Sequence, residues 1–329
     1  MRQKRELGRT RVMVSAIGLG CAGMSPEKLE RDDAESIATV RRALDLGVNF
    51  IDTSDAYGNG HNESLIGEAI KGRRKDAFVA TKFGNIRGPQ GQRGGTNGKP
   101  DYVPVACENS LKRLGIDVID LYYLHRVDPN VPIEDTVGAM ARLVEQGKVR
   151  LIGLSEAKPD LIRRAYAVHP IAALESEYSL WSREPEREIQ PLCRTLGITY
   201  VPYCPLGRGF LSGTIRAVAD VPEGDRRHDH PRFHDENLRR NLALLKPLDE
   251  LAAEKGCTQA QIALAWVLSR GTDIIPIPGS RRRPHLEENA KAVELTLSKS
   301  DCERLESVFT IGATAGLRYP EKQVPLMSF

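Results

Sequence analysis

The chain has 329 residues, of which 40% are hydrophobic, and a formal net charge of +3 from 47 basic and 44 acidic residues. This length and hydrophobic content suffice to bury a large core, in one barrel domain as easily as in two smaller domains. Because the charges are interspersed, the composition gives no reason to expect nucleic acid or an anionic membrane surface as a partner.

The cysteines argue against a metal site and against a disulfide framework. No two of them form a Cys-x-x-Cys pair, and they lie at positions 21, 107, 193, 204, 257 and 302. This pattern predicts free thiols in a reducing compartment. The N-terminus has no secretory apolar core, and no apolar run of about 18 residues occurs. We therefore expect a cytoplasmic protein.

The first predicted elements are a small hairpin and a strand within residues 7–20, which mix short apolar runs with glycines. Asp32 can then cap a helix that Gly47 ends, just before an apolar strand that finishes at Asp52. The same order of helix, glycine and buried strand recurs, with helix-ending glycines at positions 115, 147 and 197. This alternation requires parallel strands joined by helical crossovers.

The number of predicted strands indicates the architecture. Eight are expected, near residues 16–20, 48–52, 77–83, 119–125, 149–155, 172–176, 199–203 and 274–277. Eight parallel strands suggest a closed (β/α)₈ TIM barrel, here as a single domain over residues 1–329. An open doubly wound sheet is the alternative, although no Gly-x-Gly-x-x-Gly follows the first strand as a dinucleotide-binding domain of that kind would need.

The C-terminal part predicts two more helices and a tail. Thr258 with Gln261 forms a capping box for one helix, and residues 298–309 form the other. The tail that follows, with Tyr319 and Phe329, is expected to fold over the mouth of the barrel.

Two connections are too long for ordinary links between elements. They span residues 84–100 and 207–234 and are rich in Gly, Arg and Asn. We expect both to cover the barrel mouth and to set the substrate preference. Phe83 and Trp181 are expected to line an apolar pocket there.

Side chains with useful chemistry occur where several predicted strands end. Asp52 ends one strand, and Tyr57 lies in the loop beyond it; Lys82 and His125 lie at the tips of two later strands. Functional groups at the carboxyl ends of different parallel strands are what the active site of a (β/α) barrel needs. Taken singly, each has an ordinary alternative: a capping carboxylate, a packed tyrosine, a surface lysine or a core histidine.

Together the four residues suit the reduction of a carbonyl by hydride transfer. A carbonyl that accepts hydride becomes an alkoxide, so a group must donate a proton, and Tyr57 is the candidate. The ammonium of Lys82 would lower the pKa of that phenol, and Asp52 would keep the lysine charged and oriented. A neutral His125 can donate a hydrogen bond to the substrate oxygen.

This set resembles the active-site aspartate, tyrosine, lysine and histidine of the aldo/keto reductases, each in the expected strand-end context. The similarity extends from about residue 10 to about residue 310. It implies a (β/α)₈ barrel that reduces a small-molecule aldehyde or ketone with NADPH, producing NADP⁺, without a metal. Neither the substrate nor the oligomeric state follows from it.

The segment 275–289 suggests a phosphate site. A strand ends at Gly279, where backbone can approach an anion, and three arginines precede a helix. Amides at a helix N-terminus and guanidinium groups both suit a phosphate monoester, whereas the alternative is a solvated basic turn. By resemblance the segment binds the adenosine 2′-phosphate and the adenine, through Gly279, Ser280, Arg281 or Arg282, His285, Glu288 and Asn289.

The nicotinamide end of the site follows only from the resemblance. It implies contacts from Gly20, Cys21, Ala22, Ser155, Glu156, Glu175 and Tyr203, with Leu206, Gly207 and Arg208 near the pyrophosphate. Glu175 departs from the family pattern, which has Gln at this position. If it faces the carboxamide, its carboxylate can accept a hydrogen bond but cannot donate one.

Two other functions are compatible with parts of the sequence. A cofactor-sensing protein on the same barrel, like the channel-associated members of this family, would bind NADPH with little turnover. A metal-dependent barrel hydrolase would need several histidine and carboxylate ligands at strand ends, where only His125 supplies a histidine.

Overall fold

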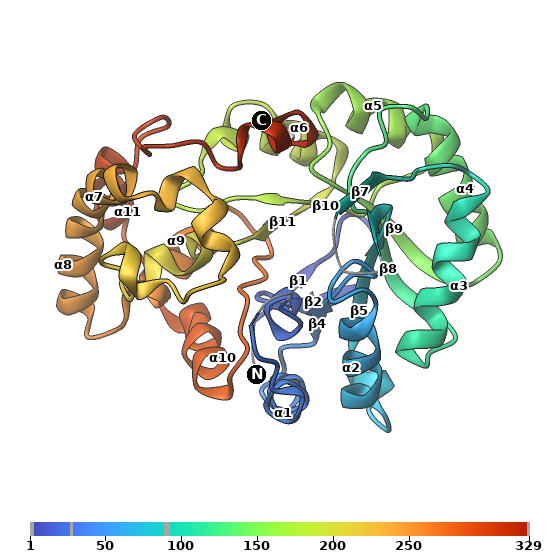
Figure 1. Cartoon of the computed structure of the whole chain (residues 1–329), viewed down its shortest axis with the longest axis horizontal. Coiled ribbons are helices and arrows are strands. Elements are labelled where there is room, and N and C mark those ends of the chain that lie inside the picture. The colour runs from blue at the N-terminus through green and yellow to red at the C-terminus, as the bar shows by residue number, and fades with distance from the viewer. Residues whose placement is uncertain (1–2, 27–28, 89–92, 328–329) are drawn as a thin grey trace.

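A computed structural model describes residues 3–26, 29–88 and 93–327 (Figure 1). Seven parallel strands form its central sheet, and neighbours in the sheet follow one another along the chain. The strands are β3 (Leu19–Gly20), β4 (Phe50–Asp52), β5 (Phe78–Phe83), β8 (Ile119–Leu124), β9 (Val149–Ser155), β10 (Ala173–Glu177) and β11 (Thr199–Tyr203).

Residues 274–279 complete the ring between the two edge strands. This segment forms parallel bridges to β11 at Tyr200 and to β3 at Gly20. Pro276 and Pro278 have no N–H to donate, so the segment makes isolated bridges and no continuous ladder. The predicted (β/α)₈ barrel is confirmed, with an irregular eighth strand.

Helices surround the sheet (Figure 1). They are α1 (Asp33–Asp45), α2 (His61–Ile70), α3 (Tyr102–Leu114), α4 (Ile133–Glu145), α5 (Pro159–Val168), α6 (Ile189–Leu196), α7 (Asp235–Leu242), α8 (Lys246–Lys255), α9 (Gln259–Ser269), α10 (Arg283–Ala290) and α11 (Lys299–Val308). Asp32 accepts from the amide of Glu35 and so caps α1, and Thr258 with Gln261 forms the predicted capping box of α9. None of the helices in the described ranges is both long and apolar enough to cross a membrane.

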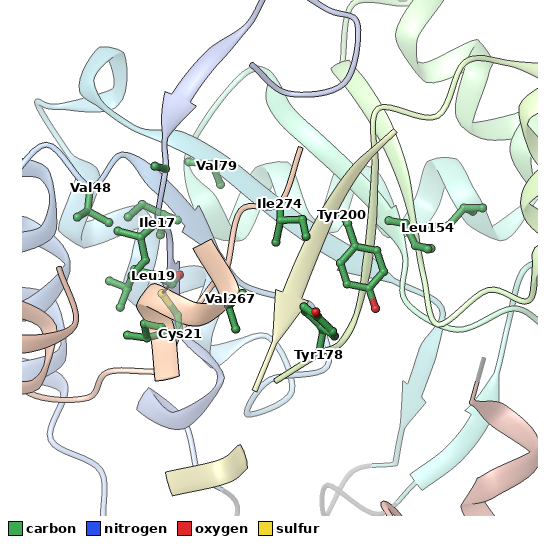
Figure 2. Close-up of a cluster of buried hydrophobic side chains, with 14 of the residues drawn as sticks. Ile17, Leu19, Cys21, Val48, Val79, Leu154, Tyr178, Tyr200, Val267 and Ile274 are labelled. Atoms are coloured by element: carbon green, nitrogen blue, oxygen red, sulfur yellow. Dashed lines mark hydrogen bonds between the residues drawn. The ribbon is translucent and has the colours of Figure 1, made fainter. Parts of the chain in front are cut away.

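The hydrophobic core has two layers, as a barrel requires. The outer layer lies between the sheet and the helices, and Figure 2 shows part of it. Its labelled members are buried to 2% exposure or less: Ile17, Leu19, Cys21, Val48, Val79, Leu154, Tyr178, Tyr200, Val267 and Ile274. The inner layer fills the barrel and includes Phe50, Phe78, Ala80, Leu121, Tyr123 and Ala173.

The predicted N-terminal hairpin closes one end of the barrel. Its strands β1 (Lys4–Glu6) and β2 (Met13–Ser15) pair antiparallel, and the inner core includes Leu7 and Val14. The amide of Gly8 donates to Thr199 Oγ1 at 2.6 Å. Because Thr199 begins β11, the hairpin lies at the amino ends of the strands and leaves the carboxyl ends open for a site.

The long connections carry some structure of their own. Residues 84–100 contain the antiparallel pair β6 (Asn85–Arg87) and β7 (Arg93–Thr96). Residues 207–234 form short 3₁₀ turns, beginning with Gly207–Ser212. The C-terminal tail reaches the barrel mouth at Tyr319, as predicted, whereas Phe329 lies outside the described residues.

Candidate active site

Strand periodicity places the predicted chemical groups inside the barrel. Successive side chains of a strand point to opposite faces, so residues two apart share a face. Phe50, Ala80 and Tyr123 belong to the inner core. Asp52, Lys82 and His125 each follow one of these by two residues and therefore continue the inward row at the carboxyl ends of the strands. Glu175 follows inward-facing Ala173 in the same way.

Lys82 is the centre of this group and is fully buried. Its ammonium donates to Asp52 Oδ1 at 2.5 Å and to the carbonyl oxygen of Thr53 at 2.9 Å. A second carboxylate oxygen, Glu175 Oε2, lies 3.1 Å from Nζ. Burial lowers the pKa of Lys82, but the carboxylates of Asp52 and Glu175 outweigh it and raise the pKa above its usual range. The lysine is therefore a fixed positive charge.

Tyr57 packs over this charge, with Lys82 Nζ 5.2 Å from the centre of its ring. The ring meets that of His125 edge to face, with centroids 5.8 Å apart. Burial raises the pKa of Tyr57, and the opposing effect of Lys82 is smaller, so the net shift is upward. The expectation that Lys82 brings this pKa down to the working range is therefore wrong for the protein as described. The phenol stays protonated and can act as a donor.

His125 is held by its neighbours on both sides. Its amide donates to the carbonyl oxygen of Phe83 at 2.8 Å, and its Nδ1 lies 3.0 Å from Ser54 Oγ. Only 7% of its surface is exposed. This fixed imidazole lies beside Tyr57 and can contact the same substrate oxygen.

Glu175 differs from the expectation that it faces the nicotinamide carboxamide, because its carboxylate is directed to Lys82. Burial, together with the nearby charge of Asp52, raises the pKa of Glu175 to about 8, against the opposing effect of Lys82. The carboxyl groups of Asp52 and Glu175 thus contact the same ammonium group, that of Lys82, in a buried site. At neutral pH the arrangement favours one negative charge, on Asp52, and a proton on Glu175.

This pKa gives a prediction for stability. Between the ordinary pKa of 4.5 and about 8, the folded state binds a proton at Glu175 that the unfolded state has lost. The contribution of Glu175 to the free energy of unfolding is therefore fully present below pH 4.5 and is lost as the pH rises to about 8. Glu175→Gln removes the effect. The variant should therefore gain in free energy of unfolding, relative to wild type, between about pH 5 and about pH 9. Urea unfolding at both pH values measures this, and parallel profiles would mean that Glu175 is ionised throughout.

A cavity of about 510 Å³ opens over these groups. Asp52, Tyr57 and His125 line it, and both long connections contribute residues, among them Ile86, Thr96 and Ser212. The cofactor residues predicted by resemblance that line it are Gly20, Ala22, Glu175, Tyr203, Leu206, Arg208, Gly279, His285, Glu288 and Asn289. Those that do not line it are Cys21, Ser155, Glu156, Gly207, Ser280, Arg281 and Arg282.

Glu156 is engaged in a network with the C-terminal tail. Arg318 donates to both of its carboxylate oxygens at 2.9 Å, and the hydroxyl of Tyr203 donates to Oε1 at 2.9 Å. The hydroxyl of Tyr203 also lies 2.9 Å from that of Tyr319. The tail is thereby attached to β11 and to the end of β9 beside the cavity.

The turn after residue 279 separates its three arginines. Arg283 pairs with Glu35 at 2.9 Å, whereas in the described ranges no carboxylate pairs with Arg281 or Arg282. Both of these side chains are exposed beside the first turn of α10. The amide of Arg283 already donates to Glu35 Oε1 at 2.9 Å, so the two exposed guanidinium groups are the main donors that this turn offers to an anion. Ser280 Oγ accepts from Asn289 Nδ2 at 3.0 Å, which fixes the turn.

Sequence reasoning misplaced two residues and missed two others. Trp181 stacks on Phe210, with ring centroids 4.0 Å apart, and Phe83 packs on Tyr122; neither Trp181 nor Phe83 lines the cavity.

The missed residues are Arg126, next to His125 in the chain, and Arg318, next to Tyr319. Their positions beside residues already singled out are the only signal that the sequence holds.

The chain is similar to known proteins over nearly its whole length. The model of the Aldo/keto reductase family matches residues 16–309. Over 322 residues the chain is 46% identical to "Probable aldo-keto reductase 1" of Glycine max, covering 96% of this chain and 92% of that protein. The structure of a glycerol dehydrogenase from Gluconobacter oxydans superposes with a TM-score of 0.86 at 25% identity, covering 95% of this chain and 97% of that one.

An aldo-keto reductase from Klebsiella pneumoniae, solved in complex with NADPH, gives a TM-score of 0.72 at 26% identity and covers 94% of this chain and 96% of that one. The family match spans the whole barrel, from the residues before β3 to the end of α11. The chain therefore belongs to the aldo/keto reductase family.

Proposed function

We propose that this protein reduces aldehydes or ketones to alcohols with NADPH, with Tyr57 as the proton donor. The observation that carries the proposal is the arrangement around Lys82. Its ammonium is held by Asp52 and Glu175, lies beneath the ring of Tyr57, and is close to the cavity that His125 lines. These are the groups that a carbonyl oxygen needs as negative charge develops on it.

The residues present fit a bound NADPH. A Cβ on Gly279 would meet no atom nearer than Gly20 O at 3.8 Å, so this part of the cavity wall is bare backbone open to a ligand. Arg281 and Arg282 would hold a phosphate at the start of α10, and Tyr203 would meet the nicotinamide end. The related reductase from Klebsiella pneumoniae, solved with NADPH, supports this choice of cofactor. The cofactor supplies the hydride when bound.

The protein groups supply orientation and a proton. His125, fixed through Ser54, orients the carbonyl oxygen, and Tyr57 donates its phenolic proton to that oxygen. Lys82 stabilises the tyrosinate left behind, because its charge lies close to the ring. Solvent then returns the proton to Tyr57. Residues of both long connections line the cavity around these groups.

A substrate screen tests the proposal. Purified protein with NADPH is mixed with aromatic aldehydes, α-dicarbonyls, sugars and bulky ketones, and oxidation of the cofactor is followed. We expect NADPH to be consumed with at least one of these classes, with formation of the matching alcohol. Tight binding of NADPH without turnover of any class would favour a cofactor-sensing role instead.

The phosphate site gives a prediction on cofactor choice. Replacing Arg281 and Arg282 by Ala should raise the KM for NADPH by about 10- to 100-fold and leave that for NADH nearly unchanged, since only NADPH carries the 2′-phosphate. Arg283→Ala is the matched control, because Arg283 is adjacent in sequence but is paired with Glu35. Equal effects on both cofactors would remove the phosphate site from this turn.

A further inference from the structure

Arg126 is a buried guanidinium in the cavity, and none of the described carboxylates forms an ion pair with it. It is 9% exposed, lies immediately after His125, and lines the cavity. One nitrogen, Nη1, donates to the carbonyl oxygen of His125 at 2.6 Å and to Ser155 Oγ at 3.0 Å. Throughout the described ranges, no Asp or Glu oxygen forms an ion pair with Arg126, and Nε and Nη2 donate to no protein group.

Other buried arginines of this chain are satisfied either by carboxylates or, as Arg5 is, by three backbone carbonyl oxygens. Arg318 makes two hydrogen bonds to Glu156, and Arg183 makes two to Glu186.

Burial lowers the pKa of Arg126, but the nearby Tyr203 and the carboxylate of Glu156 outweigh it, so Arg126 keeps its charge. Both oxygens of Glu156 accept hydrogen bonds from Arg318, and the two acceptors that Arg126 itself contacts are neutral. A guanidinium group can bind a carboxylate through two parallel N–H donors. The Nε and Nη2 groups of Arg126 remain available to bind a carboxylate in this way.

The surroundings leave a negative charge to come from the ligand. Asp52 and Glu175, the carboxylates beside the proposed chemistry, are directed to Lys82, and Glu288 accepts from Thr258 beside α10. A further arginine, Arg226 in the connection 207–234, lines the same cavity. Among the described lining residues, four arginines stand against three carboxylate residues, which favours an anionic ligand.

We propose that Arg126 binds a carboxylate on the substrate, so that the preferred substrates are aldehydes or ketones that carry a carboxylate group. This inference rests on the proposed carbonyl reduction. Because Arg126 follows His125 directly, the carboxylate lies close to the carbonyl that Tyr57 and His125 hold. The same contact orients the substrate and selects it against neutral analogues.

Matched pairs of substrates test the inference. Succinic semialdehyde and carboxybenzaldehyde are each compared with the neutral methyl ester of the same compound. In wild type, kcat/KM should favour the acid over its ester by about 10- to 100-fold, the usual effect of a hydrogen-bonded charge pair. In Arg126→Gln, which keeps donors for His125 and Ser155 but has no charge, this ratio should fall to near unity. Arg126→Lys should keep part of it.

A binding measurement separates this inference from the proposed function. Butanoate, which cannot be reduced, is titrated into the protein–NADP⁺ complex and followed by fluorescence. We expect binding in wild type and its loss in Arg126→Gln, with the dissociation constant for NADPH unchanged. No preference for acids, or an equal loss of acid and ester turnover in Arg126→Gln, would overturn the inference, as would weaker NADPH binding in that variant. If neither the acid nor its ester is reduced, the proposed carbonyl reduction fails for those compounds. Butanoate binding then tests Arg126 by itself, because it should be present in wild type and lost in Arg126→Gln.

Discussion

Replacing Tyr57 by Phe is expected to lower kcat for carbonyl reduction by about 10²- to 10⁴-fold, because it removes the general acid and little else. The ring, its edge-to-face contact with His125 and its position over Lys82 are all retained by Phe. NADPH should bind to the variant with an unchanged dissociation constant. Steady-state kinetics with the best aldehyde and a fluorescence titration with NADPH provide the two measurements.

The pH profile gives an independent check on the same residue. Because burial keeps the pKa of Tyr57 above its usual range, the donor stays protonated through neutral and mildly alkaline pH. In wild type, deprotonation of Tyr57 should therefore cause no loss of reduction rate at neutral and mildly alkaline pH. The residual rate of Tyr57→Phe should show no pH dependence from a phenol. A variant with full turnover would remove Tyr57 from the mechanism.

Replacing Lys82 by Met should affect both activity and stability. It leaves the buried carboxylate of Asp52 without its counter-ion, which should lower the free energy of unfolding by about 3–5 kcal/mol at neutral pH. It also removes the positive charge beside Tyr57, which should lower kcat by about 10²- to 10³-fold. Urea unfolding and steady-state kinetics measure the two effects.

A double variant separates these effects. Lys82→Met with Asp52→Asn has no unpaired carboxylate at this contact, so most of the lost stability should return while the activity stays low. Glu175→Gln alone is the matched control, since it removes the other carboxylate on Lys82 and leaves the ammonium in place. Recovery of activity in the double variant would mean that Lys82 serves only as a structural partner of Asp52.

The barrel and the central group of the site could be predicted because both follow from local pattern. Alternation along strands fixes which side chains face inward, and helix-ending glycines at positions 47, 115, 147 and 197 mark four of the crossovers. The side chains of Asp52, Lys82 and His125 therefore point into the barrel at the carboxyl ends of the strands, independently of the loop conformations. The last strand was predicted near residues 274–277, but its irregular pairing, which coincides with Pro276 and Pro278, was not.

What could not be predicted depends on contacts between distant parts of the chain. The carboxylate of Glu156 meets Arg318, which is 162 positions away, through a tail that has no periodic pattern. The partner of Glu175 depends on the distance across the barrel between β10 and β5. The net pKa of Tyr57 depends on how far burial outweighs one nearby charge, a balance that residue types alone do not determine.

Transfer of hydrogen from the cofactor to a carbonyl tests the central proposal most directly. The protein is loaded with one equivalent of NADPH deuterated at C4 of the dihydronicotinamide and mixed rapidly with excess aldehyde, and the products are analysed by mass spectrometry. Using both C4 epimers removes any dependence on which face reacts. The account predicts one equivalent of alcohol that carries deuterium on its carbinol carbon with one of the epimers. Bound NADPH that persists unchanged, with no labelled alcohol from either epimer, would contradict it.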